Sequence, residues 1–131
     1  MNNKYLSDIL NGRKKLYSSE EQKIGVTDEG TQIYRKTIYT IMTYFNKQSS
    51  GYQDATISAG VKIKKLLGIN CVIQKNDGTV NYGLPFSSTG NSLGIWFNKM
   101  SDNVSATTLH FFNNVEWGSD YKLVTTIDYT K

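Results

Sequence analysis

The stretch Tyr121–Thr130, with the sequence YKLVTTIDYT, alternates strictly between two sets of side chains. One set consists of Tyr121, Leu123, Thr125, Ile127 and Tyr129, and the other of Lys122, Val124, Thr126, Asp128 and Thr130. Successive side chains of a β-strand point to opposite faces of the sheet. The stretch is therefore predicted to be a strand that turns its first set toward a core and its second set outward.

Segments of the same kind precede this stretch, with turn-forming residues between them. The predicted strands span residues 32–45, 57–67, 70–75, 80–84, 93–99 and 104–112. NDG at 76–78 predicts a hairpin between 70–75 and 80–84, because Asn, Asp and Gly tolerate positive φ. MSDN at 100–103 predicts a second hairpin. Short strands at this spacing predict an all-β fold, an antiparallel β-sandwich of jelly-roll type.

The segment 32–45 is long, and neither of its faces is purely apolar, so we expect it to kink or to bury different faces along its length. Residues 4–11 have apolar side chains at helical spacing before Gly12, which predicts a short helix. Two turns of helix are too short to be stable alone, so this helix needs a partner surface. We therefore expect an N-terminal attachment segment, 1–16, followed by a β-sandwich domain, 17–131.

The composition favours an ordinary globular domain. The chain has 131 residues, nine of them Tyr, and a formal net charge of +4. This mild excess of basic over acidic residues is not typical of a nucleic-acid-binding protein. In the densest basic stretch, Lys62–Lys65, lysines alternate with Val61 and Ile63, which favours a strand with one solvent-facing side over a phosphate-binding patch. No apolar run approaches the roughly 18 residues of a membrane span, and the N-terminus lacks a signal-peptide core. We expect synthesis in the cytosol and no membrane partner.

Residues able to do chemistry are sparse. Cys71 and His110 are the only residues of their kinds, so no zinc site is expected, and Cys71 is expected to be buried and inert. Acids combine with a large aromatic side chain in one place, where Glu116 and Asp120 flank Trp117. We predict no catalytic cluster, no metal and no cofactor. Turnover of a cell-wall glycan remains a minor alternative.

Four acids near the N-terminus allow two interpretations. Glu20, Glu21, Asp28 and Glu29 are either catalytic carboxylates or part of a scaffold that leads into the first strand. Glu20 and Glu21 cannot act together, because sequence neighbours point to different sides. Spacing alone does not decide between the two interpretations.

The two ends of the chain resemble a known family. YSSEEQKIG, the turn EG and IYRKTI at 17–38, together with EWGSDYKLVTTIDYTK at the end, resemble a C-terminal module of tail-fibre, head-fibre and other virion proteins of bacteriophages and prophages of low-GC bacteria. The resemblance spans Tyr17–Lys131 and is specific at both ends only. Thr27 stands where the family commonly has Trp, and Glu29 where it has Asp, so the turn is expected to pack differently.

The resemblance implies a scaffold role for the front segment, with Glu20 and Glu21 solvated or hydrogen-bonded between chains. It also implies a β-sandwich that assembles as a homotrimer on a virion, attached to other virion proteins through the N-terminal segment. Such modules bind host cell-wall carbohydrate or decorate the particle. Sugar sites use aromatic faces. The candidate ligand-binding residues are Tyr52, Tyr82, Trp117 and Tyr121, whereas Trp96 is expected in the core.

Two functional hypotheses follow from the resemblance. The first is a non-enzymatic fibre-tip or receptor-binding module, and the second is a structural capsid or head-fibre decoration protein. The trimer is also expected from the segment 32–45, because Ile38, Met42 and Tyr44 would leave an apolar face wet in a monomer. Three copies about a threefold axis would cover it.

Overall fold

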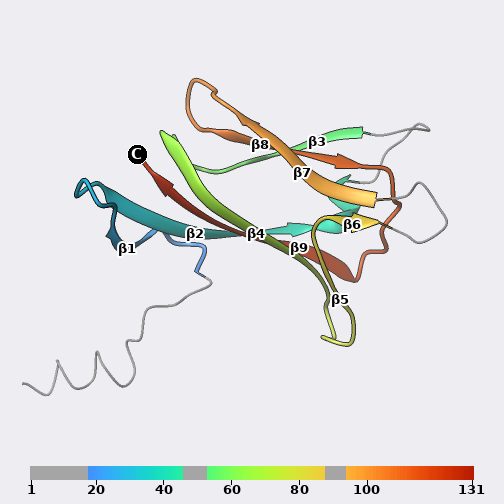
Figure 1. Ribbon diagram of the computed structural model, residues 1–131. Coiled ribbons are helices and arrows are strands. Elements are labelled where there is room, and N and C mark those ends of the chain that lie inside the picture. Colours follow the sequence, from blue (N-terminus) through green and yellow to red (C-terminus); the bar gives the residue numbers. More distant parts are fainter. Residues whose placement is uncertain (1–17, 46–52, 88–93) are drawn as a thin grey trace, which may run out of the picture.

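A computed structural model describes residues 18–45, 53–87 and 94–131 (Figure 1). Its elements in chain order are β1 (Gln22–Val26), β2 (Gln32–Ile41), a 3-10 helix η1 (Met42–Phe45), β3 (Gln53–Ser58), β4 (Lys65–Lys75), β5 (Asn81–Gly83), β6 (Phe86–Ser87), β7 (Gly94–Ser101), β8 (Thr108–Asn113) and β9 (Tyr121–Thr130). The helix expected at 4–11, with the whole attachment segment 1–16, lies outside the described residues.

The strands form two antiparallel sheets. The five-stranded sheet has the order β1-β2-β9-β4-β5, and the four-stranded sheet has the order β3-β8-β7-β6. Figure 1 shows β2, β9 and β4 in one layer and β3, β8 and β7 in the other. This confirms the predicted all-β fold with two antiparallel sheets packed as a sandwich.

The strand β9 is the centre of the five-stranded sheet. It pairs with β2 from Tyr34↔Tyr129 to Ile41↔Lys122, and with β4 from Lys65↔Thr130 to Lys75↔Tyr121. Its predicted inward face is confirmed, although Val124 and Thr130 of the other set are also buried. Leu123, Thr125, Ile127 and Tyr129 face inward and have no exposed surface.

The core lies between the inward faces of the two sheets. From the five-stranded sheet come Ile73, Leu123, Ile127 and Tyr129, and from the four-stranded sheet Ile57, Ile95, Leu109 and Phe111. The rings of Phe45 and Phe97 contact the ring of Phe111 edge-on, and their centroids lie 5.8 and 5.5 Å from its centroid. Burial of these apolar side chains is the main stabilising contribution to the fold.

Both predicted hairpins are present. β4 and β5 pair antiparallel around the NDG turn, where Gly78 has a φ of 77°. This positive φ is easily adopted only by glycine and a few polar residues. β7 and β8 also pair antiparallel, with a longer connection than the four-residue turn expected.

Two predicted strands are wrong in extent. The strand expected at 32–45 ends at Ile41, because the chain then coils into η1 and buries both Met42 and Phe45. The strand expected at 57–67 is divided, since β3 ends at Ser58 and β4 begins at Lys65. Between them the basic stretch still alternates, with Ile63 buried and its lysine neighbours exposed, although it is not a strand.

The apolar face of the segment 32–45 that was expected to pack against other chains is mostly internal. Met42 is fully buried, and Ile38 packs against the core of its own chain. Only Tyr44 of that set is exposed, at 62%. β2 turns its other face outward, which leaves Tyr39 and Ile41 49% and 61% exposed.

The strands β1 and β6 were not expected from the sequence. β1 begins within the polar front segment and pairs with the start of β2, and β6 contributes only two residues. The turn at Asp28–Gly30 is confirmed, with Gly30 at a φ of 85°. Thr27 and Glu29, which depart from the family pattern, bond each other there, with 3.3 Å between hydroxyl and carboxylate.

The front segment is fastened to the C-terminal strand by Glu21. The buried Tyr129 hydroxyl donates to one carboxylate oxygen of Glu21, and Lys131 donates to the other at 2.7 Å. The Tyr129 ring also stacks on Tyr34, with 6.0 Å between centroids. Glu21 is therefore a structural residue, as expected, but its partners belong to its own chain. Glu20 is exposed.

The charge of Glu21 gives this contact a pH dependence. Partial burial opposes ionisation, but hydrogen bonds from Lys131 and Tyr129 outweigh it and hold the pKa of Glu21 below its ordinary value of 4.5. A carboxyl whose pKa is lowered by folding stabilises the fold above its unfolded pKa. That stabilisation is lost as the pH falls through the folded pKa.

We predict that Glu21→Gln lowers the free energy of unfolding near neutral pH, and that its difference from the parent shrinks as the pH falls from about 6 to about 3. Urea unfolding at several pH values, followed by tryptophan fluorescence, measures this difference. Glu20→Gln is the matched control. A Glu21→Gln difference that does not change with pH would contradict the account.

Candidate functional site

Three of the four predicted ligand-binding residues lie together. The Trp117 ring meets Tyr121 at 5.6 Å and Tyr82 at 6.3 Å between centroids. Tyr82 and Tyr121 are half-buried, and Trp117 is only 8% exposed. The fourth residue, Tyr52, lies outside the described residues. The fold thus assembles an aromatic cluster whose central ring faces the core.

Asn113 holds Trp117 in this position. Its side-chain oxygen accepts from the Trp117 indole nitrogen at 3.1 Å, and its amide nitrogen donates to the carbonyls of Phe45 and Val115, both at 2.9 Å. Asn113 is itself fully buried. A buried amide with these partners ties together the end of β8, η1 and the loop 114–120, so Trp117 is placed as a packing residue.

We predict that Trp117→Ala destabilises the protein by about 3–5 kcal/mol, because it empties a large buried site. It also leaves the Asn113 oxygen short of one donor. Urea unfolding monitored by circular dichroism measures the loss. Trp96→Ala is the comparison, since Trp96 is half-buried. Equal stabilities of parent and Trp117→Ala would mean that Trp117 does not contribute to the core.

Trp96 does not lie in the core as predicted. It projects from the outer face of the four-stranded sheet, where it meets Phe112 at 5.7 Å between centroids. Trp96 also helps to line an apolar cleft of about 460 Å³ between the edges of β4 and β7. The other residues of this cleft are Ile69, Cys71, Leu84, Pro85 and Phe97.

The titratable residues outside these clusters are dispersed. Cys71 is buried as predicted, and burial raises the pKa of its thiol to about 11. Ser101 and His110 lie 2.7 Å apart across β7 and β8, but neither lines one of the grooves described in this section. Glu116 is exposed. Within 18–45, 53–87 and 94–131, no group of three or more His, Cys, Asp or Glu could hold a metal ion.

The outer face of the five-stranded sheet carries a groove of about 310 Å³, which we call the outer groove. Its lining residues are Tyr39, Asn70, Val72, Gln74, Val124 and Thr126. They come from β2, β4 and β9, and all of them alternate with core residues of the same strands. The register sets Tyr39 beside Val124 and Val124 beside Val72, so three apolar side chains cross the sheet in one row.

Hydrogen-bonding side chains flank this row on both sides. Asn70 and Thr126 are cross-strand partners on one side, and Gln74 pairs with Lys122 on the other. In the part of the chain that the structure describes, neither the Asn70 nor the Gln74 amide bonds to another residue. Each amide therefore has donors and acceptors available for a ligand.

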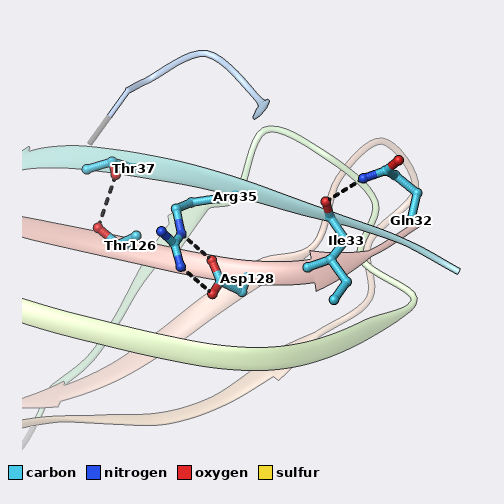
Figure 2. Close-up of polar contacts among 6 residues, drawn as sticks. All are labelled: Gln32, Ile33, Arg35, Thr37, Thr126 and Asp128. Carbon is cyan, nitrogen blue, oxygen red and sulfur yellow. Dashed lines mark hydrogen bonds and ion pairs between the residues drawn. The ribbon is translucent and has the colours of Figure 1, made fainter. Parts of the chain in front are cut away.

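Beyond Thr126, polar side chains of the outer face form hydrogen bonds and an ion pair with one another. Figure 2 shows Arg35 aiming two nitrogens at the two carboxylate oxygens of Asp128, at 2.7 and 2.9 Å. It also shows the hydroxyls of Thr37 and Thr126 facing each other at 3.0 Å. A bidentate pair of this kind is rigid and cancels its own charge. Lys122 lies near Tyr39, 5.9 Å from its ring centre.

Sequence reasoning did not find the outer groove. Tyr39 lies in the segment 32–45, neither of whose faces is purely apolar, and Asn70 and Gln74 lie in the predicted strand 70–75. The available signal was the alternation of Asn70, Val72 and Gln74 with the buried Cys71 and Ile73. That alternation gives one outward face, but only the pairing of β2, β9 and β4 aligns three such faces.

No family model matches this chain, and comparisons with curated proteins and with solved structures gave no match. No helix among the described residues has the length and apolar character needed to cross a membrane.

Proposed function

We propose that this protein is a non-enzymatic bacteriophage virion protein, a fibre-tip or receptor-binding module that recognises host cell-surface carbohydrate. The resemblance at Tyr17–Ile38 and at the C-terminal end supports the virion assignment, and the two-sheet sandwich is the architecture that the resemblance implies. In this proposal the sandwich is of jelly-roll type, and residues 1–16, with the helix at 4–11, attach it to other virion proteins.

The outer groove is the observation that carries carbohydrate recognition. The C–H-bearing face of a sugar ring packs on an aromatic ring, while its hydroxyl groups both donate and accept hydrogen bonds. Tyr39, with about half of its surface exposed, offers such a ring. Asn70 and Gln74 lie beside the apolar row, and each of their amides carries both a hydrogen-bond donor and an acceptor. An apolar floor with a few placed polar groups is the usual chemistry of a ligand site.

In this proposal the outer groove, and not the aromatic cluster around Trp117, is the main contact with carbohydrate. Tyr82 and Tyr121 keep partial exposure, so the edge of that cluster remains a second contact surface in this proposal. Tyr52 also remains a candidate contact from the sequence. The buried Trp117 ring then acts by holding Tyr121 and Tyr82 in place.

We predict that Tyr39→Ala weakens binding to purified cell walls of susceptible low-GC bacteria by about tenfold or more, because the groove loses the one aromatic ring among its described lining residues. Co-sedimentation with the walls measures it. Val104→Ala is the control, since Val104 is 95% exposed and does not line the groove. Equal binding of the parent and Tyr39→Ala would contradict the role of the groove in binding. If the parent does not bind cell walls, the proposed receptor recognition is wrong.

The alternative is a capsid or head-fibre decoration protein with a structural role. Immunogold labelling of virions separates the two, because label on the capsid and not on the tail would contradict the fibre-tip proposal. Release of soluble sugar from purified walls by the recombinant protein would contradict the non-enzymatic assignment.

We propose a homotrimer in the virion. The apolar side chains available for its interface differ from those expected, because Met42 is buried. Tyr44 and Ile41 are exposed near the end of β2, at 62% and 61%. We predict a mass of about three times the 14.8 kDa chain by light scattering at micromolar concentration. A mass of 14.8 kDa would exclude the trimer, and twice that mass would indicate a dimer.

A further inference from the structure

We infer that the outer groove binds an uncharged polysaccharide whose chain lies across β2, β9, β4 and β5. This inference rests on the proposed carbohydrate recognition and adds the charge of the ligand and its direction.

The direction follows from the register of the strands. Tyr39, Val124 and Val72 stand side by side on three neighbouring strands, and Val72 is paired in turn with Gly83 on β5. The apolar row therefore runs perpendicular to the strands. Neighbouring strands are about 4.8 Å apart, so four strands span about 14 Å. This length exceeds a single sugar ring and suits several linked rings.

One end of the row lies at an edge of the sheet. β5 is an edge strand, and its residue in the row is Gly83, which has no side chain to close the groove. At the other end, β1 pairs with β2 as far as Arg35, and the Ser18 carbonyl accepts a hydrogen bond from the Thr37 amide, so the front segment follows β2 toward Tyr39. A bound chain can therefore extend beyond the row at the β5 edge.

The charge of the ligand follows from the lining. None of the six lining residues is charged. The nearest charges beyond Thr126 belong to Arg35 and Asp128, which neutralise each other at 2.7 Å. On the opposite side Lys122 is a single cation near the Tyr39 ring. A polyanion would place successive charges over an uncharged floor and lose hydration without compensation. Neutral hydroxyls, in contrast, match the amides of Asn70 and Gln74.

Gly83 offers a test that removes no existing contact. A Cβ built on Gly83 meets no atom within 4 Å, and the same holds for Gly68, which faces outward from β4 beside Asp128. Neither glycine has a positive φ. Gly83→Leu therefore puts a side chain into the end of the row without strain, and Gly68→Leu adds the same side chain to the same face outside the groove.

The experiment is affinity electrophoresis in native gels that contain dextran, laminarin, mannan or galactan, with poly(glycerol phosphate) teichoic acid as the anionic polymer. We expect at least one neutral polymer to retard the parent. We expect Gly83→Leu to weaken that retardation roughly tenfold or more, and Gly68→Leu to leave it unchanged. Fragments of the retarding polymer should compete better as their length increases from one ring to several.

Three results would overturn the inference: retardation by teichoic acid alone or by no neutral polymer, equal retardation of Gly83→Leu and parent, or competition by a single sugar as strong as by a longer fragment. Each result leaves the proposed function standing if Tyr39→Ala still loses binding to cell walls. If cell-wall binding is also absent in the parent, both proposals fail. Circular dichroism of both glycine variants verifies that they are folded.

Discussion

The double pairing of β9 is the constraint on which the rest of the structure depends. This strand lies between β2 and β4, and both neighbours bond to it along nearly its whole length. The sheet therefore gains its centre only when segments far apart in the sequence meet. Contacts that join such distant segments form slowly, because the loop entropy is lost before they are made. The inward residues of β9 also supply the middle of the core, so one strand fixes both the pairing and the packing.

Two polar contacts secure segments whose own sequences are too polar to pack. Glu21 binds the hydroxyl of Tyr129 and the ammonium of Lys131, which holds the front segment against the end of β9. Asn113 binds the indole of Trp117 and the carbonyl of Phe45, which holds the loop before β9. In both cases a buried or half-buried polar group finds its full set of partners. Such groups specify one arrangement, because any other would leave them unpaired.

The outer face of the five-stranded sheet is then free to differ from the inner one. The same strands that contribute Cys71, Ile73 and Leu123 to the core present Asn70, Gln74 and Thr126 outward. This face rests on a rigid, centrally braced sheet, so its side chains are held in a fixed pattern. A ligand that matches the pattern loses little to reorganisation of the protein. This rigidity favours the proposed recognition of an uncharged polysaccharide.

The sequence by itself determined the fold class, the strand 121–130 with its two faces, the two hairpins and the burial of Cys71, because alternation and turn residues are local signals. It did not determine that residues 32–45 leave the strand at Met42, since the burial of Met42 and Phe45 against the core outweighs local strand preference. It misplaced Trp96 and took Trp117 for a loop contact, although Asn113 draws that ring inward. Only the tertiary structure decided the outer groove, because Tyr39, Val124 and Val72 belong to three strands far apart in sequence, and a site made of cross-strand neighbours exists only once their register is fixed.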